Sequence, residues 1–190
     1  MHKARLEAFS DGVIAILITI MVLEFHVPEG ADWAALRPLT PTFATYVVSF
    51  IFIGIYWSNH HHLLHATERV TGGILWANLH LLFWLSLVPF VTAWVGRNHL
   101  EAVPTATYGV VLLMAAIAYT ILQTAILAHH GPNSALARAL GDDAKGKLSM
   151  VLYAAAIPLA FVNQWASDVI YVAIAMTWLV PDPRIEKKMM

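Results

Sequence analysis

The chain has 190 residues, of which 59% are hydrophobic and only 12% are charged. Soluble globular domains carry about 25% charged residues, so this sequence has too little polar surface for a water-soluble fold. Eleven basic residues against 12 acidic ones give a net charge of −1, so no basic surface for nucleic acid is expected. The sequence has no cysteine, which excludes disulfides and cysteine-ligated metal. The composition predicts an integral membrane protein with a single domain over residues 1–190.

Six apolar segments follow one another along the chain. A transmembrane helix needs about 20 apolar residues, and each segment is interpreted as one span. The spans cover about residues 9–25, 43–64, 74–95, 105–128, 148–166 and 168–180. The last two leave room only for a tight turn, at residues 163–168. The predicted fold class is therefore an all-α membrane bundle with six transmembrane helices per subunit.

The basic residues indicate how these spans are oriented. If the N-terminus is cytoplasmic, that side holds nine of the eleven, namely Lys3, Arg5, Arg69, Arg138, Lys145, Lys147, Arg184, Lys187 and Lys188. The opposite side holds Arg37 and Arg97. Short loops rich in lysine and arginine face the cytoplasm. We therefore expect a multi-pass protein of the cell membrane whose N- and C-termini are both cytoplasmic.

The first segment opens with charges that lie close to its apolar part. Charged groups near a span are functional candidates, because they are costly in lipid. Ser10 or Asp11 can act as a plain helix N-cap, accepting hydrogen bonds from free backbone amides. Alternatively, Asp11 is buried and pairs with Arg5 or with a histidine from another helix, since a buried charge needs a partner.

An apolar stripe continues along the same segment. Ile16, Ile20 and Leu23 recur at i, i+4 and i+7, so they share one helix face, with Thr19 beside them. Glu24 ends the segment, where its carboxylate can reach water or form a ring in an oligomer. Such a stripe faces lipid, packs against protein or lines a pore, and the spacing alone leaves all three open.

Three motifs carry a family resemblance, and each lies in one of the first three spans. They are Arg5-x-x-x-Phe9-Ser10-Asp11-Gly12 continuing to Leu23-Glu24, then Tyr56-Trp57-x-Asn59-His60-His61-His62, then Trp76-x-Asn78-Leu79 with Ser86-Leu87-x-Pro89-Phe90-x-Thr92. Together they resemble the transmembrane protein 175 family, which comprises potassium-permeable channels of endolysosomes and bacteria. The motifs cover about half of the chain, and the last three spans match in hydropathy and length only.

The resemblance implies a homotetramer of six-helix subunits in the lipid bilayer, with the first helix of each subunit lining the pore. In the family, apolar side chains form the constriction, and the matching positions are Ile16, Ile20 and Leu23. The threonine that matches Thr19 is linked to potassium preference. Four copies of Ile16 would form a ring that resists wetting and acts as a hydrophobic gate. Glu24 would concentrate cations at the outer mouth, which is our inference and no family trait.

Histidines gather where the second span ends, and His80 follows in the third span. His61 and His65 stand at i and i+4, a spacing that can bind a divalent metal, and paired transmembrane histidines can ligate haem. The alternative is a polar network that holds the helices in register, and the resemblance favours it. The expected network comprises Arg5, Phe9, Ser10, Asp11, Trp57, His61, His62 and Asn78. We expect no resident metal or cofactor, with K⁺ as the permeant ion.

Three other functions remain open at this point. A proton-conducting channel is a variation on the potassium channel. A secondary transporter would need discontinuous helices around a midplane site, and Pro89 and Pro158 are possible breaks. A histidine-ligated haem or metal protein of the membrane is the third. Among these readings the motifs favour a channel without enzymatic activity.

Overall fold

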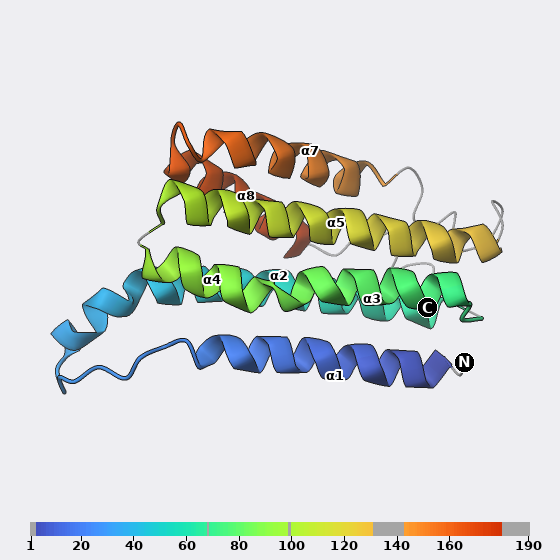
Figure 1. Cartoon of the computed structure of the whole chain (residues 1–190), viewed down its shortest axis with the longest axis horizontal. Coiled ribbons are helices and arrows are strands. Elements are labelled where there is room, and N and C mark those ends of the chain that lie inside the picture. The colour runs from blue at the N-terminus through green and yellow to red at the C-terminus, as the bar shows by residue number, and fades with distance from the viewer. Residues whose placement is uncertain (1–2, 68, 99, 131–142, 180–190) are drawn as a thin grey trace.

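A computed structural model of the chain describes residues 3–67, 69–98, 100–130 and 143–179. Within these ranges the regular structure is entirely helical, which confirms the all-α expectation for this part of the chain. The helices are α1 (Lys3–Val22), α2 (Thr40–His65), α3 (Gly72–Ser86), α4 (Val88–Arg97), α5 (Ala102–His130), α7 (Ala144–Leu159) and α8 (Gln164–Leu179), with the 3₁₀ helix η1 (Trp33–Leu39) before α2. Helices α3 and α4 lie end to end (Figure 1), so the described helices form a bundle of six rods.

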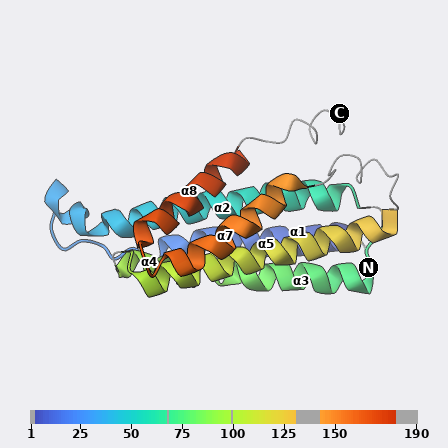
Figure 2. The same cartoon turned by 90° about the horizontal axis from the view of Figure 1, so that it is seen from above.

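Helix α1 lies along one edge of this bundle (Figure 1). It packs against α2, α3 and α4, while α5 packs against α3, α4 and α7. Helix α8 completes the other side through contacts with α7, α2 and α5, and Figure 2 shows it diverging from α5 as it leaves the α7–α8 turn. The position of α1 leaves one of its long faces uncovered by any helix that the structure describes.

The described helices differ in length and hydropathy, and α1, with 20 residues, is not among the stretches long and apolar enough to cross a membrane. Three stretches are long and apolar enough to cross a membrane, namely Trp33–His65, Gly72–Arg97 and Ala102–His129. Helices α7 and α8 have 16 residues each, and a helix of that size is about 24 Å long. The hydrocarbon core of a bilayer is about 30 Å thick. Helix α7, both of whose ends are described, therefore falls short of a full perpendicular crossing by its helical residues alone.

The helices differ from the first and third predicted spans, and both differences have local causes. Helix α1 ends at Val22 rather than near residue 25, since Leu23 N bonds to Ile20 O at 3.0 Å and the next amides follow the same i−3 pattern. Such bonds tighten the last turn of a helix and end it. The third span is broken at Leu87, because Pro89 lacks an N–H and its ring displaces the carbonyl four residues earlier.

The turn before α8 also lies earlier than expected. Helix α7 ends at Leu159, directly after Pro158, and α8 begins at Gln164. The side-chain oxygen of Asn163 accepts a hydrogen bond from Ala166 N at 3.2 Å and so caps α8. The turn therefore occupies residues 160–163 instead of 163–168, which places Asp168 inside α8.

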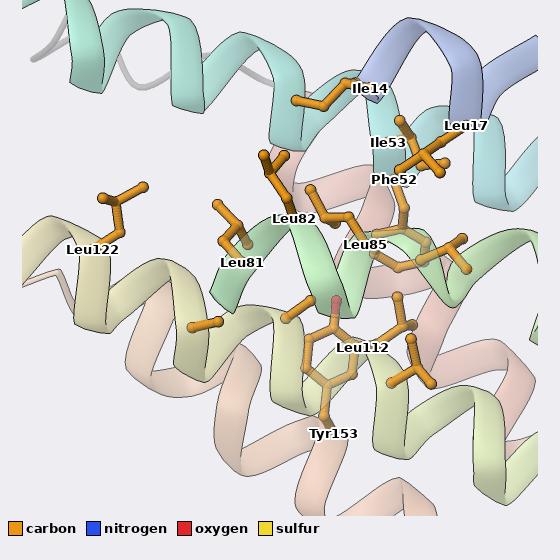
Figure 3. Close-up of a cluster of buried hydrophobic side chains, with 14 of the residues drawn as sticks. Ile14, Leu17, Phe52, Ile53, Leu81, Leu82, Leu85, Leu112, Leu122 and Tyr153 are labelled. Carbon is orange, nitrogen blue, oxygen red and sulfur yellow. The ribbon is translucent and has the colours of Figure 1, made fainter. Parts of the chain in front are cut away.

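A single apolar cluster joins the helices (Figure 3). Its buried side chains come from every rod of the bundle, and those labelled in Figure 3 are Ile14, Leu17, Phe52, Ile53, Leu81, Leu82, Leu85, Leu112, Leu122 and Tyr153. In a lipid environment such side chains stabilise the bundle through close packing, because lipid tails are as apolar as the core.

The described basic residues lie at the two ends of the bundle. Lys3 Nζ donates to the carbonyl of His65 and Thr71 Oγ1 lies 3.4 Å from His129 Nε2, so the ends of four helices meet there. Lys3, Arg5 and Arg69 belong to this end, Lys145 and Lys147 lie in the first turn of α7, which begins toward the same end (Figure 1), and Arg37 and Arg97 belong to the other end. Arg138, Arg184, Lys187 and Lys188 lie outside the described residues, as does the last residue of the predicted sixth span.

Candidate functional site

Helix α1 has one face inside the bundle and one outside. The buried positions follow a helical spacing and are Leu6, Ser10, Ile14, Leu17 and Met21. The opposite face exposes large apolar side chains, namely Phe9, Ile16, Ile20 and Leu23. Ile16 is 57% exposed and Leu23 is 76% exposed. The stripe identified in the sequence therefore points away from the helix bundle of its own chain, although Leu23 stands in the turn that follows the helix.

Thr19 supplies a polar atom on this outward side. Its hydroxyl lies 2.9 Å from the carbonyl oxygen of Ile16 and 3.2 Å from that of Ala15, and it donates to the backbone of its own helix. A hydroxyl that donates in this way keeps its oxygen lone pairs as acceptors. The exposed Thr19 oxygen thus remains available as an acceptor on this face.

The end of α1 is joined to α4 by an ion pair. Arg97 Nη2 donates to Glu24 Oε2 at 2.6 Å, and the side chains are 50% and 34% exposed. Beside this pair a groove of about 490 Å³ runs between α1 and α4, with Ile20 and Trp94 among its walls. The sequence had not identified a partner for Glu24, because Arg97 lies 73 positions further along the chain.

A buried polar network fixes the rotation of α1 against its neighbours. Asn78 Nδ2 on α3 donates to Ser10 Oγ on α1 at 3.0 Å, and His60 Nε2 on α2 donates to Asn78 Oδ1 at 2.6 Å. All three side chains are at most 1% exposed. Buried polar groups that satisfy one another specify a unique packing, because any other rotation leaves them unpaired. This chain of hydrogen bonds holds the apolar stripe of α1 outward.

A second polar group lies nearer the surface at the same level. Trp57 Nε1 donates to Asp11 Oδ1 at 3.0 Å, and the His61 ring stacks on Trp57 with centroids 6.1 Å apart. Asp11 therefore pairs with neither Arg5 nor a histidine, and the sequence-based choice of partner was wrong. The reason is that the indole N–H of Trp57 reaches across from α2 to the carboxylate.

The remaining members of the expected network lie outside both groups. Arg5, Phe9 and His62 are exposed, and within the described residues no hydrogen bond or ion pair involves Arg5. The His62 ring contacts only the edge of His61, with centroids 5.6 Å apart. Of the eight predicted members, Ser10 and Asn78 thus belong to the buried network. Asp11, Trp57 and His61 form the surface group, and the other three belong to neither.

His60 is a buried polar position that the sequence-based selection left out. It lies seven residues after buried Ile53 and four before buried Leu64, so apolar spacing would have placed it on the inward face of α2. A further buried group was also missed, in which Ser49 Oγ lies 2.8 Å from Tyr108 OH and 2.7 Å from Thr92 Oγ1. It joins α2, α4 and α5 inside the bundle.

The histidines were also candidates for metal or haem ligands. The rings of His61 and His65 are 6.2 Å apart by their centroids, on the exposed side of α2. His80 Nε2 accepts from Trp84 Nε1 at 3.0 Å within its own helix. Over the described ranges, no three histidine, aspartate or glutamate side chains gather as a metal site.

Comparison with known proteins places these features in a family. The family model described as the endosomal/lysosomal potassium channel TMEM175 matches residues 5–89. A protein named a potassium channel, from Chryseobacterium sp. (strain P1-3), is 52% identical over 189 residues, which cover 100% of this chain and 98% of that relative. The chain belongs to the TMEM175 family. The resemblance inferred from the three motifs is confirmed, and it extends over the last three helices as well.

Other relatives show how far the likeness reaches. A potassium channel from Streptomyces collinus is 38% identical over 129 residues, 64% of this chain and 63% of the relative. The crystal structure of a lysosomal potassium-selective TMEM175 homologue from Chamaesiphon minutus matches with a TM-score of 0.79 and 28% identity, over 94% of this chain and 96% of that one. The endosomal/lysosomal proton channel TMEM175 of Bos taurus is 37% identical over 83 residues, 17% of its length.

Proposed function

We propose that this chain is the subunit of a potassium-permeable cation channel whose pore is lined by α1. One observation carries the proposal, namely that α1 is anchored on one side by Ser10 and Asn78 while its other side exposes Ile16 and Leu23. Membership of TMEM175 and the names of the bacterial relatives support the same function. An anchored helix with a free apolar stripe is what a hydrophobic constriction requires.

A single α1 cannot enclose a pore, so several copies have to face one another. We infer a homotetramer, in which four Ile16 side chains form the narrowest ring and Ile20 and Leu23 extend it outward. Such a ring resists wetting, and opening requires the four α1 helices to shift or rotate apart. Apolar side chains cannot replace the hydration shell of an ion, so selectivity for K⁺ depends on the cost of dehydration and on the Thr19 oxygen. Glu24 lies where it would raise the cation concentration at the outer mouth.

The membrane topology follows from the same arrangement. We infer six crossings in the cell membrane with both termini cytoplasmic, because most described basic residues share the bundle end where α1 begins. The short helix α7 would then reach the interfaces with the help of its flanking residues, which is one ordinary response to a mismatch in length.

A proton channel is the second candidate function. The observation in its favour is the name of the animal relatives, of which the bovine protein is called a proton channel. Reversal potentials decide between the two ions. With a K⁺ gradient and equal pH, a potassium channel shifts its reversal potential toward the K⁺ equilibrium potential, whereas a proton channel responds only to a pH gradient.

The pore assignment is tested by potassium flux into liposomes that contain the purified protein. The variant Ile16→Asn should increase the K⁺ flux, by about tenfold for each 1.4 kcal/mol that the polar ring removes from the permeation barrier. It should also weaken the preference for K⁺ over Na⁺. The matched control is Ile121→Asn, because Ile121 is also an exposed isoleucine but lies on α5. No flux above empty vesicles at any pH would overturn the channel function. Equal currents from Ile16→Asn and the wild type would remove Ile16 from the constriction.

A further inference from the structure

A cavity unrelated to the α1 face lies near the bundle end where α8 begins. Its volume is about 190 Å³, and its walls come from α2, α5 and α8 together with the end of α4. The lining is almost entirely apolar and aromatic, with Val48, Tyr108, Tyr171 and Val172 among its members. The exceptions are Thr45, whose hydroxyl donates to Pro41 O at 2.9 Å, and Asp168, whose carboxylate belongs to the same wall.

The carboxylate of Asp168 is incompletely satisfied. Its Oδ2 atom is buried, and none of the described residues offers it a hydrogen bond. The two neighbouring tyrosine hydroxyls are engaged elsewhere, since Tyr108 OH lies 2.8 Å from Ser49 Oγ and Tyr171 OH donates to Thr105 O at 3.3 Å. A buried carboxylate oxygen without a partner costs free energy, and pairing it with a cation removes much of that cost.

The rings of the two tyrosines add a second cation-binding element. Tyr108 and Tyr171 stand with their centroids 5.8 Å apart, and both rings line the cavity. The face of an aromatic ring attracts an organic cation by its quadrupole, most strongly where water is excluded. The cavity thus combines one unpaired carboxylate oxygen, two aromatic rings and an apolar wall.

This chemistry selects one class of cation. Hard metal ions take about six to eight oxygen ligands or keep their waters, and a mostly apolar wall with one carboxylate does not provide them. An organic ammonium ion needs only a single counter-charge and gains from aromatic and apolar contacts. One water molecule occupies roughly 10–15 Å³ by the same measure. The cavity volume of about 190 Å³ is more than ten times larger, so the cavity has room for a ligand of about ten heavy atoms.

We propose that this cavity binds a small organic ammonium ion with an apolar body, with the ammonium group at Asp168 Oδ2 and the body between Tyr108, Tyr171 and Val172. The site is separate from the proposed pore, because none of its described lining residues comes from α1. It therefore stands or falls independently of the potassium flux experiments.

The test is a calorimetric titration of the full chain in lipid nanodiscs with 2-phenylethylammonium, with empty nanodiscs subtracted for partitioning into lipid. We expect saturable binding of one ligand per chain, and at least tenfold weaker binding of 2-phenylethanol, which has the same shape without the charge. Asp168→Asn should weaken ammonium binding at least tenfold. The matched control Glu101→Gln removes an exposed carboxylate outside the cavity and should leave binding unchanged.

A second variant separates loss of binding from loss of folding. Val172→Trp fills the cavity from a half-exposed position while Asp168 stays in place, so it should abolish binding in a protein that keeps the helical content of the wild type. The proposal is overturned if the wild type binds no ammonium ligand saturably, if Asp168→Asn binds as tightly as the wild type, or if the neutral alcohol competes equally.

Discussion

Asn78 is the residue on which the orientation of α1 depends most directly. The variant Asn78→Leu keeps the volume of the side chain but removes its bonds to Ser10 and His60. Interhelical hydrogen bonds in membrane proteins contribute about 0.6 kcal/mol each, and at most about 1.7. The loss of two such bonds predicts a decrease in the free energy of unfolding of about 1 to 3 kcal/mol.

The assay is reversible unfolding in mixed detergent micelles with increasing dodecyl sulfate, followed by far-ultraviolet circular dichroism. A double-mutant cycle with Ser10→Ala isolates the pair, because Ser10 makes its side-chain bond to Asn78. We expect the double variant to be less destabilised than the sum of the single ones, by about 0.6 kcal/mol or more. Additive effects, or an Asn78→Leu protein as stable as the wild type, would show that this network does not hold α1.

Two further predictions concern packing and the outer charges. Gly96→Ala should destabilise the protein by about 1–3 kcal/mol in the same unfolding assay, because a Cβ there would lie 2.7 Å from the Cα of Thr42. The control is Gly54→Ala, where an added Cβ would have nothing within 4 Å. This control should be neutral or stabilising by up to about 1 kcal/mol. Glu24→Gln should reduce the K⁺ flux at about 10 mM salt but should change it little at about 1 M, since the screening length falls from about 30 Å to 3 Å. Arg97→Gln should raise the K⁺ flux at low salt, because it leaves the Glu24 carboxylate without its counter-charge. Equal flux from both variants at low salt would contradict a role for Glu24 at the mouth.

Sequence alone identified much of the architecture. Low charge and six apolar segments predicted a helical membrane protein, and the spacing of Ile16, Ile20 and Leu23 placed them on one helix face. The motifs around Ser10, Trp57 and Asn78 led to the correct family. These features are readable because hydropathy and helical periodicity act locally, within one or two turns of the chain.

Helix ends were less predictable than helices. The tightened end of α1 at Val22 and the cap at Asn163 each depend on a few local hydrogen bonds, whereas the break at Leu87 follows from Pro89, which the sequence had marked as a possible break. Hydropathy averages over many residues and does not register such bonds. It therefore placed the α7–α8 turn a few residues late and Asp168 at the boundary rather than inside α8.

Only the tertiary structure decided which polar groups meet. Ser10 and Asn78 lie 68 positions apart and Glu24 and Arg97 lie 73 apart, and their pairing depends on how each helix is rotated and displaced against the next. The same packing buried His60 while leaving His61 and His62 exposed, although the three are consecutive in the sequence. Periodicity defines the apolar stripe of α1, but the direction of that stripe follows from the buried bonds on its opposite face. For this reason the outward direction of the stripe and the cavity at Asp168 depend on how the helices are assembled.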